Sequence, residues 1–312
     1  MVDNLINIIN KLRIPKVILR FIMMNFLDIS SINNLLLTVK EMNVLDNYSK
    51  DLVINANKGF IWNCKNGHLA VAKWLYFIGD INIHASKTSA FIKSCKNGHL
   101  HIAKWLYSLG DVNIHAENEY AFRWSCIGGH LTVAKWIYSL GEGMDRTDPS
   151  SPARKGQGDV DIHAENGHAF RWSCIGGHLT VAKWIYSLGD VNIHADNECA
   201  FRWSCIGGHL TVAKWIYSQG DVNIHADNEC AFRWACGEGH LTVAQWLYSL
   251  GQVNIHADNE CAFGWACKNG HLIVAQWLYC LGQVNIHANN EYAFAHAKGN
   301  TLDWLNSLIT KN

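Results

Sequence analysis

Residues 207–232 read GGHLTVAKWIYSQGDVNIHADNECAF, and this stretch decides the fold. A glycine–histidine pair precedes a pattern of apolar residues at helical spacing that stops at Gly220, and an extended DVNI segment follows. An acidic tip, residues 227–229, then leads into the next apolar pattern. The stretch recurs, and the histidine after the glycine marks each copy: His68, His99, His130, His178, His209, His240 and His271. Such a recurrence is typical of a stacked repeat array.

The spacing of the copies defines the repeat. Successive histidines are 31 residues apart, except for a gap of 48 between His130 and His178. The longer gap fits one repeat plus an insertion at about 142–158, where proline, glycine and serine predict a flexible loop. A length of 312 residues would fit two ordinary domains, but a repeat array grows along one axis and escapes that estimate.

The overall composition excludes several classes of protein. An apolar content of 49% is ample for a buried core. Lys plus Arg and Asp plus Glu are both 26, so no excess of basic charge favours a nucleic-acid partner. The apolar run 17–27 is too short to span a bilayer and contains Arg20, and no cleavable signal is evident. We therefore expect an intracellular, cytoplasmic protein that binds neither nucleic acid nor membrane.

Seven of the eleven cysteines share one repeat position: Cys64, Cys95, Cys126, Cys174, Cys205, Cys236 and Cys267. Stacked helices lie ~8–10 Å apart, whereas the Cα atoms of a disulfide lie within roughly 7 Å, so we expect reduced core thiols. Each of these cysteines precedes a histidine by four residues, but two ligands do not complete a zinc site. The sequence therefore predicts no metal, no cofactor and no catalytic residues.

Two columns of tryptophan and two of histidine recur with the repeat. The column on the second helix of each repeat contains Trp215, and the column on the first helix contains Trp203. Both are expected to pack between repeats, with a partly exposed aromatic stripe as the alternative. The histidines after glycine are expected to bond to the backbone at a turn, and those of the second column, such as His225, to hold the hairpin. Asp227 or Asn228 is expected to cap the helix that follows the tip.

The repeat resembles that of the ankyrin family. The resemblance rests on the recurring Gly-His turn, on VAKWIY at 212–217, where the family has V-V-x-x-L-L, and on GDVN at 220–223, where it has G-x-D-V-N. Two departures are the 31-residue period instead of 33 and CAFR at 230–233 in place of T-P-L-H. The compact, Trp- and Tyr-rich repeats are similar to ankyrin arrays of giant DNA viruses, which would place a viral protein in the host cytoplasm.

The resemblance implies an all-α, ankyrin-repeat solenoid over residues 53–312, with seven full repeats and a degenerate last one. Residues 1–52 lie outside the repeat, and two interpretations of them stay open. One is a helical cap that covers the first repeat. The other is a docking module, because Ile14-Pro15, residues 17–21, Leu27-Asp28 and Val39-Lys40 resemble the start of an F-box, which links proteins to a ubiquitin-ligase scaffold.

Ankyrin arrays bind partners with their hairpin tips and the exposed side of the first helices, along the concave face. The resemblance thus implies a partner-binding surface made of an acidic ridge, an arginine row and aromatics: Glu119, Tyr120, Arg123, Arg171, Glu198, Arg202, Glu229, Arg233, Glu260 and Tyr292. The alternative is that these charges pair within the chain. The expected function is a monomeric, non-catalytic scaffold for a protein partner, or alternatively a substrate-recruiting adaptor of a ubiquitin ligase.

Overall fold

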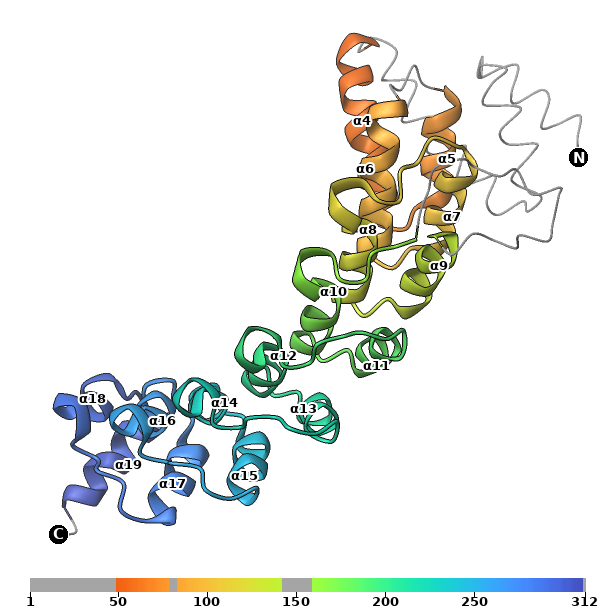
Figure 1. Cartoon of the computed structure of the whole chain (residues 1–312). Helices are drawn as coiled ribbons and strands as arrows, with labels where there is room; N and C mark the ends of the chain where they lie inside the picture. The colour runs from red at the N-terminus through yellow and green to blue at the C-terminus, as the bar shows by residue number, and fades with distance from the viewer. Residues whose placement is uncertain (1–48, 79–82, 142–158, 311–312) are drawn as a thin grey trace, which may run out of the picture. The chain divides into compact units, whose positions relative to one another are not determined.

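The computed structural model describes residues 49–78, 83–141 and 159–310, which form sixteen helices and no strand (Figure 1). The fold is therefore all-α, as expected. Residues 1–48, with the cap and F-box interpretations, and the insertion at 142–158 lie outside the described residues.

The helices fall into two compact units. The N-terminal unit comprises residues up to 125 together with 132–160, and the C-terminal unit comprises 126–131 and 161–312. The N-terminal unit contains α4 (Ser49–Lys65), α5 (Leu69–Ile78), α6 (Ile83–Lys96), α7 (Leu100–Ser108) and most of α8 (Ala116–Ile127) and α9 (Leu131–Gly141).

The C-terminal unit contains five further helix pairs. They are α10 (Ala164–Ile175) with α11 (Leu179–Ser187), α12 (Ala195–Ile206) with α13 (Leu210–Tyr217), α14 (Ala226–Gly237) with α15 (Leu241–Ser249), α16 (Ala257–Lys268) with α17 (Leu272–Leu281), and α18 (Ala288–His296) with α19 (Asn300–Ile309). The first helices stack in chain order from α10 to α18, and α4 packs on α6 in the same way. Each unit is thus a stack of ankyrin-like helix pairs.

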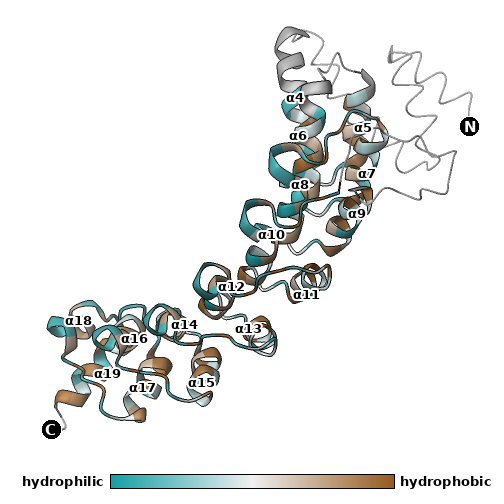
Figure 2. Cartoon of the chain, viewed as in Figure 1, coloured by the Kyte–Doolittle hydropathy of each residue, from teal (hydrophilic) through white to brown (hydrophobic). Residues whose placement is uncertain are grey.

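The core of each repeat comes from the same positions. Phe201 and Cys205 on the first helix, and Val212, Ala213 and Ile216 on the second, have no exposed surface. Hydrophobic colour accordingly gathers on second helices such as α9 and α11, and hydrophilic colour at the starts of first helices such as α8 and α10 (Figure 2). All eleven cysteines are free, and burial raises the pKa of the Cys64 and Cys267 thiols to about 12. The prediction of reduced core thiols is confirmed for the seven cysteines of the shared position.

The tryptophan of the second helix joins neighbouring repeats. The Trp215 ring lies 6.2 Å from the Phe170 ring and 5.6 Å from the Tyr186 ring, centroid to centroid, and both belong to the preceding repeat. The same three-ring cluster occurs around Trp105, Trp136, Trp246 and Trp277, and at the last helix around Trp304. The prediction of packing between repeats is therefore confirmed at Trp105, Trp136, Trp215, Trp246 and Trp277.

The tryptophans of the first helices pack differently: the same prediction holds for Trp234 and Trp265, whose rings are in contact, and is wrong for Trp172 and Trp203. Trp172, Trp203 and Trp234 are 43%, 46% and 37% exposed. The reason is the helical period: Phe201 and Cys205, four residues apart, both face the core, and Trp203 midway between them is rotated about 200° away. At Trp172 and Trp203, the alternative of an exposed aromatic stripe is the one the structure shows.

The Gly-His turn fastens each repeat to the one before it. Gly208 has a φ of 74°, which glycine adopts without strain, and the His240 ring of the next repeat lies directly against it. At His99 the ring Nε2 is 2.9 Å from the backbone oxygen of Lys65 in the preceding repeat. The expected bond to the backbone is confirmed at His99, and it reaches across the repeat boundary.

Candidate interaction surface

Six hairpin tips, at 117–119, 165–167, 196–198, 227–229, 258–260 and 289–291, are each a single left-handed turn, whereas 86–88 are regular helix within α6. Asp227, Asn228 and Glu229 have φ/ψ of 58/47°, 54/60° and 61/29°. Asp and Asn tolerate the left-handed region better than other non-glycine residues, which suits the first two positions. The expected capping role is not seen for Asp227, whose carboxylate instead accepts a hydrogen bond from Arg202 Nη1 of the preceding repeat (2.7 Å).

The third tip residue, a glutamate, is an internal link between repeats. Glu229 Oε1 accepts a hydrogen bond from the backbone N–H of Asn254 in the next repeat (3.2 Å) and lies 2.7 Å from His225 Nδ1. Glu198 and Glu260 have the same partners in their own repeats. The His225 column thus takes part in the hairpin, as expected.

These glutamates do not form an open acidic ridge. Glu119, Glu198, Glu229 and Glu260 are only 5–8% exposed. The side chains of Glu198, Glu229 and Glu260 are buried because their carboxylates accept a backbone N–H of the next repeat and so point into the contact between the two repeats. The sequence could not show this, because the left-handed turn that directs the side chain inward has no motif of its own. The exposed carboxylates are those of the aspartates at the first tip position, such as Asp227.

The arginine row also serves the tips. Arg233 Nε donates to the backbone oxygen of Asn228 (2.7 Å), Nη2 to that of Asp227 (3.2 Å), and Nη1 to the Asp258 carboxylate of the next repeat (2.5 Å). Arg202 makes the same three bonds one repeat earlier. Arg123 bonds its own tip, and Arg171 bonds its own tip and Asp196. The arginines thus pair within the chain, as the alternative interpretation held, and Arg123 and Arg233 are buried.

The two tyrosines of the expected surface are half-buried and stack on neighbouring aromatic rings, of which Trp124 is half-buried and His296 is exposed. The Tyr120 ring stacks on the Trp124 ring at 5.4 Å, and the Tyr292 ring stacks on the His296 imidazole at 4.2 Å. Both stay candidates for partner contact.

A tryptophan stripe is one of two exposed aromatic columns of the C-terminal unit; the other is made of second-helix tyrosines that are 36–41% exposed, Tyr186, Tyr217, Tyr248 and Tyr279. We use the name tryptophan stripe for Trp172, Trp203, Trp234 and Trp265, which lie one repeat apart on α10, α12, α14 and α16. The Trp234 and Trp265 rings are in contact, with centroids 4.4 Å apart. The sequence carried the signal in the two-residue offset from the phenylalanine and cysteine columns, but the periodicity of tryptophan alone favoured the core.

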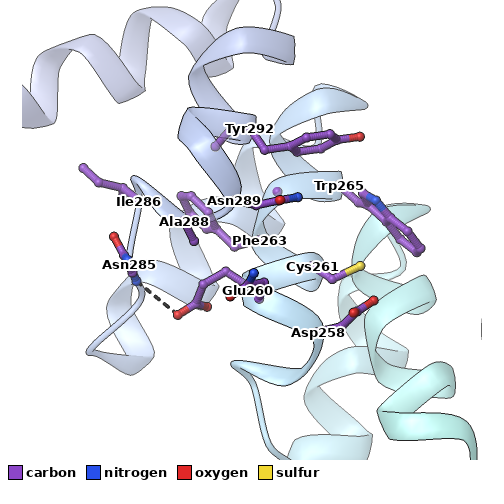
Figure 3. Close-up of a pocket in the computed structure, with 13 residues that line it drawn as sticks. Asp258, Glu260, Cys261, Phe263, Trp265, Asn285, Ile286, Ala288, Asn289 and Tyr292 are labelled. Carbon is purple, nitrogen blue, oxygen red and sulfur yellow. Dashed lines mark hydrogen bonds between the residues drawn. The ribbon is translucent and has the colours of Figure 1, made fainter.

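A cavity of about 250 Å³ lies between α16 and α18, with Tyr292 and Asn289 on one side and Asp258, Glu260 and Cys261 on the other (Figure 3). Within the described ranges, no group of three or more His, Cys, Asp or Glu side chains could hold a metal ion. Of the helices described, none is long and apolar enough to cross a membrane.

Comparison with known proteins agrees with the architecture. A family model described as ankyrin repeats (3 copies) matches residues 60–148 and 201–290, which together exceed half of the chain. A solved structure, the human ASB11 ankyrin repeat domain, is 16% identical and covers 67% of this chain and 97% of its own, with a TM-score of 0.46. No curated protein matches. From the family match and the stacked helix pairs, the chain belongs to the ankyrin repeat family.

Proposed function

We propose that this chain is a non-catalytic scaffold that binds a protein partner through the tryptophan stripe and the adjoining hairpin tips. Ankyrin repeats are in general protein–protein interaction modules. The observation that carries the proposal is the exposure of Trp172, Trp203 and Trp234, because large aromatic side chains left on a surface are enriched in binding interfaces.

The arrangement favours an elongated contact. Neighbouring first helices lie ~8–10 Å apart, so four stripe positions can follow an extended or helical segment of a partner over ~30 Å. Exposed aspartates at the tips, such as Asp196 and Asp227, give this stripe a polar border. An apolar centre with a polar rim is the usual anatomy of a protein interface. By family resemblance this side of the first helices is the concave face.

The exposed tryptophans of the stripe also contribute little to the packing of the repeats. Trp203 is 46% exposed, whereas the Trp215 column already fills the seams between repeats. Replacing a stripe tryptophan should therefore weaken binding more than folding. We further propose that the protein is monomeric and cytoplasmic. Its viral origin remains a prediction, as does the role of residues 1–52 as a cap or an F-box-like adaptor.

The experiment is proximity labelling in the native cell with three versions of the full chain. They are the unchanged protein, the double variant Trp203→Ser/Trp234→Ser, and a matched control, Ile273→Ser, which removes an exposed apolar side chain on the second helix α17 (68% exposed). Partners should be lost with the stripe variant and kept with the control. Partners that persist in both, with circular dichroism unchanged, would rule out the stripe. Deletion of residues 1–52 in the same assay tests the adaptor: ligase-scaffold components should disappear with the deletion, and their absence from the full chain contradicts it.

A further inference from the structure

The arginine row ends at Gly264, and this substitution leaves a site without its side chain. Gly264 lies 31 residues after Arg233, at the same position of the repeat. In the two preceding repeats, Arg202 and Arg233 each donate to two backbone oxygens of their own tip and to an aspartate of the next tip. Glycine offers no donor to the corresponding atoms of its own repeat.

The acceptors themselves are still in place. Asp258 and Asn259 have φ/ψ of 57/45° and 61/52°, within about 8° of those of Asp227 and Asn228. Their carbonyl groups therefore have the orientation that receives the Arg233 guanidinium one repeat earlier. Asn289 occupies the position of Asp258, so a side-chain oxygen is also retained at the next tip, without its charge.

The cavity coincides with this missing side chain. Its lining includes Gly264, Asp258, Asn259 and Asn289, and its volume of about 250 Å³ is sufficient for a guanidinium group and its first methylenes. Tyr292 lines it as well, where the repeat before has the smaller Cys261. A Cβ placed on Gly264 would lie 3.1 Å from Tyr292 Cδ1, so the tyrosine ring has taken part of the space and presents an aromatic surface to the rest.

A buried carboxylate in the cavity lining favours a cation. Glu260 lines the cavity and is 8% exposed, and its Oε2 has no hydrogen-bond partner, as is also true of Glu229 Oε2 one repeat earlier. Two cations oppose this charge. Arg233 already donates to the Asp258 carboxylate (2.5 Å). The Lys268 Nζ is solvent-exposed and lies 3.1 Å from the Tyr292 hydroxyl and 5.7 Å from its ring centroid. A planar guanidinium matches two carbonyls and an aromatic face better than an ammonium does, because its donors form a fixed fork and its plane stacks on rings.

We propose that the cavity beside Gly264 binds an arginine side chain supplied by a protein partner, which takes the place that Arg233 fills within the chain one repeat earlier. The proposal rests on the proposed scaffold function for the source of the arginine. It deepens that function by naming one residue type that the partner presents next to the tryptophan stripe.

The test uses N-acetyl-arginine N-methylamide as the probe, titrated into the full chain and followed by the backbone amide resonances of Gly264 and Tyr292. Saturable shifts are expected, with affinity about fivefold higher than for the citrulline and lysine derivatives, since hydrogen bonds from a charged donor exceed neutral ones and the fork is absent in lysine. Equal shifts with citrulline, or none with arginine, would overturn the proposal. Because the probe is a small molecule, the result is independent of whether the cellular partners of the stripe are found.

Two variants complete the test. Gly264→Arg together with Tyr292→Cys recreates the side chains of the preceding repeat, and binding of the probe should disappear because the site is filled from within. Asn289→Asp restores the carboxylate at an exposed position, and should raise the affinity severalfold. Probe binding that survives the first variant, or does not rise with the second, would contradict an arginine site.

Discussion

The tip at 163–167 and the tip at 225–229 share a backbone conformation but differ in two side chains, and the one that matters is the last. Both turns are left-handed through three residues. The later tip ends in Glu229, which links His225 to Asn254 of the next repeat, whereas the earlier one ends in Gly167. A second cavity, of about 140 Å³, lies at Gly167 and is lined by His163 and Asn192, which stand where His225 and Asn254 do. A cavity thus lies where glycine replaces the tip glutamate, at Gly167, and another where glycine replaces the arginine, at Gly264.

The seams behind these two tips do not differ. Phe170 and Phe232, the phenylalanines of the two repeats, each lie 6.2 Å from a tryptophan, Trp215 and Trp277 respectively. The comparison therefore separates two layers of the structure. The aromatic seams recur around Trp105, Trp136, Trp215, Trp246, Trp277 and Trp304, whereas the tips can lose a member without loss of the fold.

The largest expected loss of stability comes from removing a tryptophan of the aromatic seams, which both repeats share. Trp215→Ala and Trp277→Ala should each lower the free energy of unfolding by ~3–5 kcal/mol, because each removes a ring that packs on two aromatic residues of the preceding repeat. Urea unfolding monitored by circular dichroism measures the loss. The two variants should agree, and a loss below ~1 kcal/mol in either would show that its seam does not hold the repeats.

The next largest loss of stability is expected from removing the glutamate of the complete tip at 225–229. Glu229→Ala should cost about 2–3 kcal/mol, because it leaves the Asn254 N–H and His225 without their buried acceptor. Glu229→Gln is the matched control, since its side-chain oxygen can still accept the backbone bond, and it should cost less than half as much. Equal losses from the two variants would mean that the negative charge of Glu229, and not the acceptor oxygen, matters.

A smaller effect repairs the incomplete tip. Gly167→Glu should raise the free energy of unfolding by about 0.5–1 kcal/mol, because two new hydrogen bonds of ~1 kcal/mol each exceed the ~1 kcal/mol strain of a non-glycine residue at a φ of 68°. No atom would lie within 4 Å of the new Cβ, so the side chain has room. Gly167→Ala, which adds the strain without the bonds, should instead lower it by about 1 kcal/mol. Two changes of the same sign would contradict the glutamate link.

The same comparison shows how far the sequence reaches. The repeat, the Gly-His turn and the buried Phe201 and Cys205 follow from spacing alone, since a helix with a fixed apolar face must bury it. The inward direction of Glu229 does not, because it depends on three successive left-handed residues that local preference disfavours. Nor does the exposure of Trp203 follow from its hydrophobicity; it follows from its two-residue offset from the core positions. The burial of Glu229 and the exposure of Trp203 thus depend on the direction in which each side chain points and not on the type of residue.

The smallest expected effect is a pH dependence of stability that arises from His178, in the Gly-His turn of the repeat whose tip ends in Gly167. Burial, with a lesser contribution from nearby His209, lowers the pKa of His178 below its ordinary value of about 6.5. The unfolded chain therefore binds a proton before the folded chain does, and stability should fall as pH drops below about 6.5, through the folded-state pKa of His178. His178→Gln should reduce the difference in urea midpoint between pH ~7.5 and ~5.0 relative to the unchanged protein. An undiminished difference would assign the pH dependence to the other histidines of the chain.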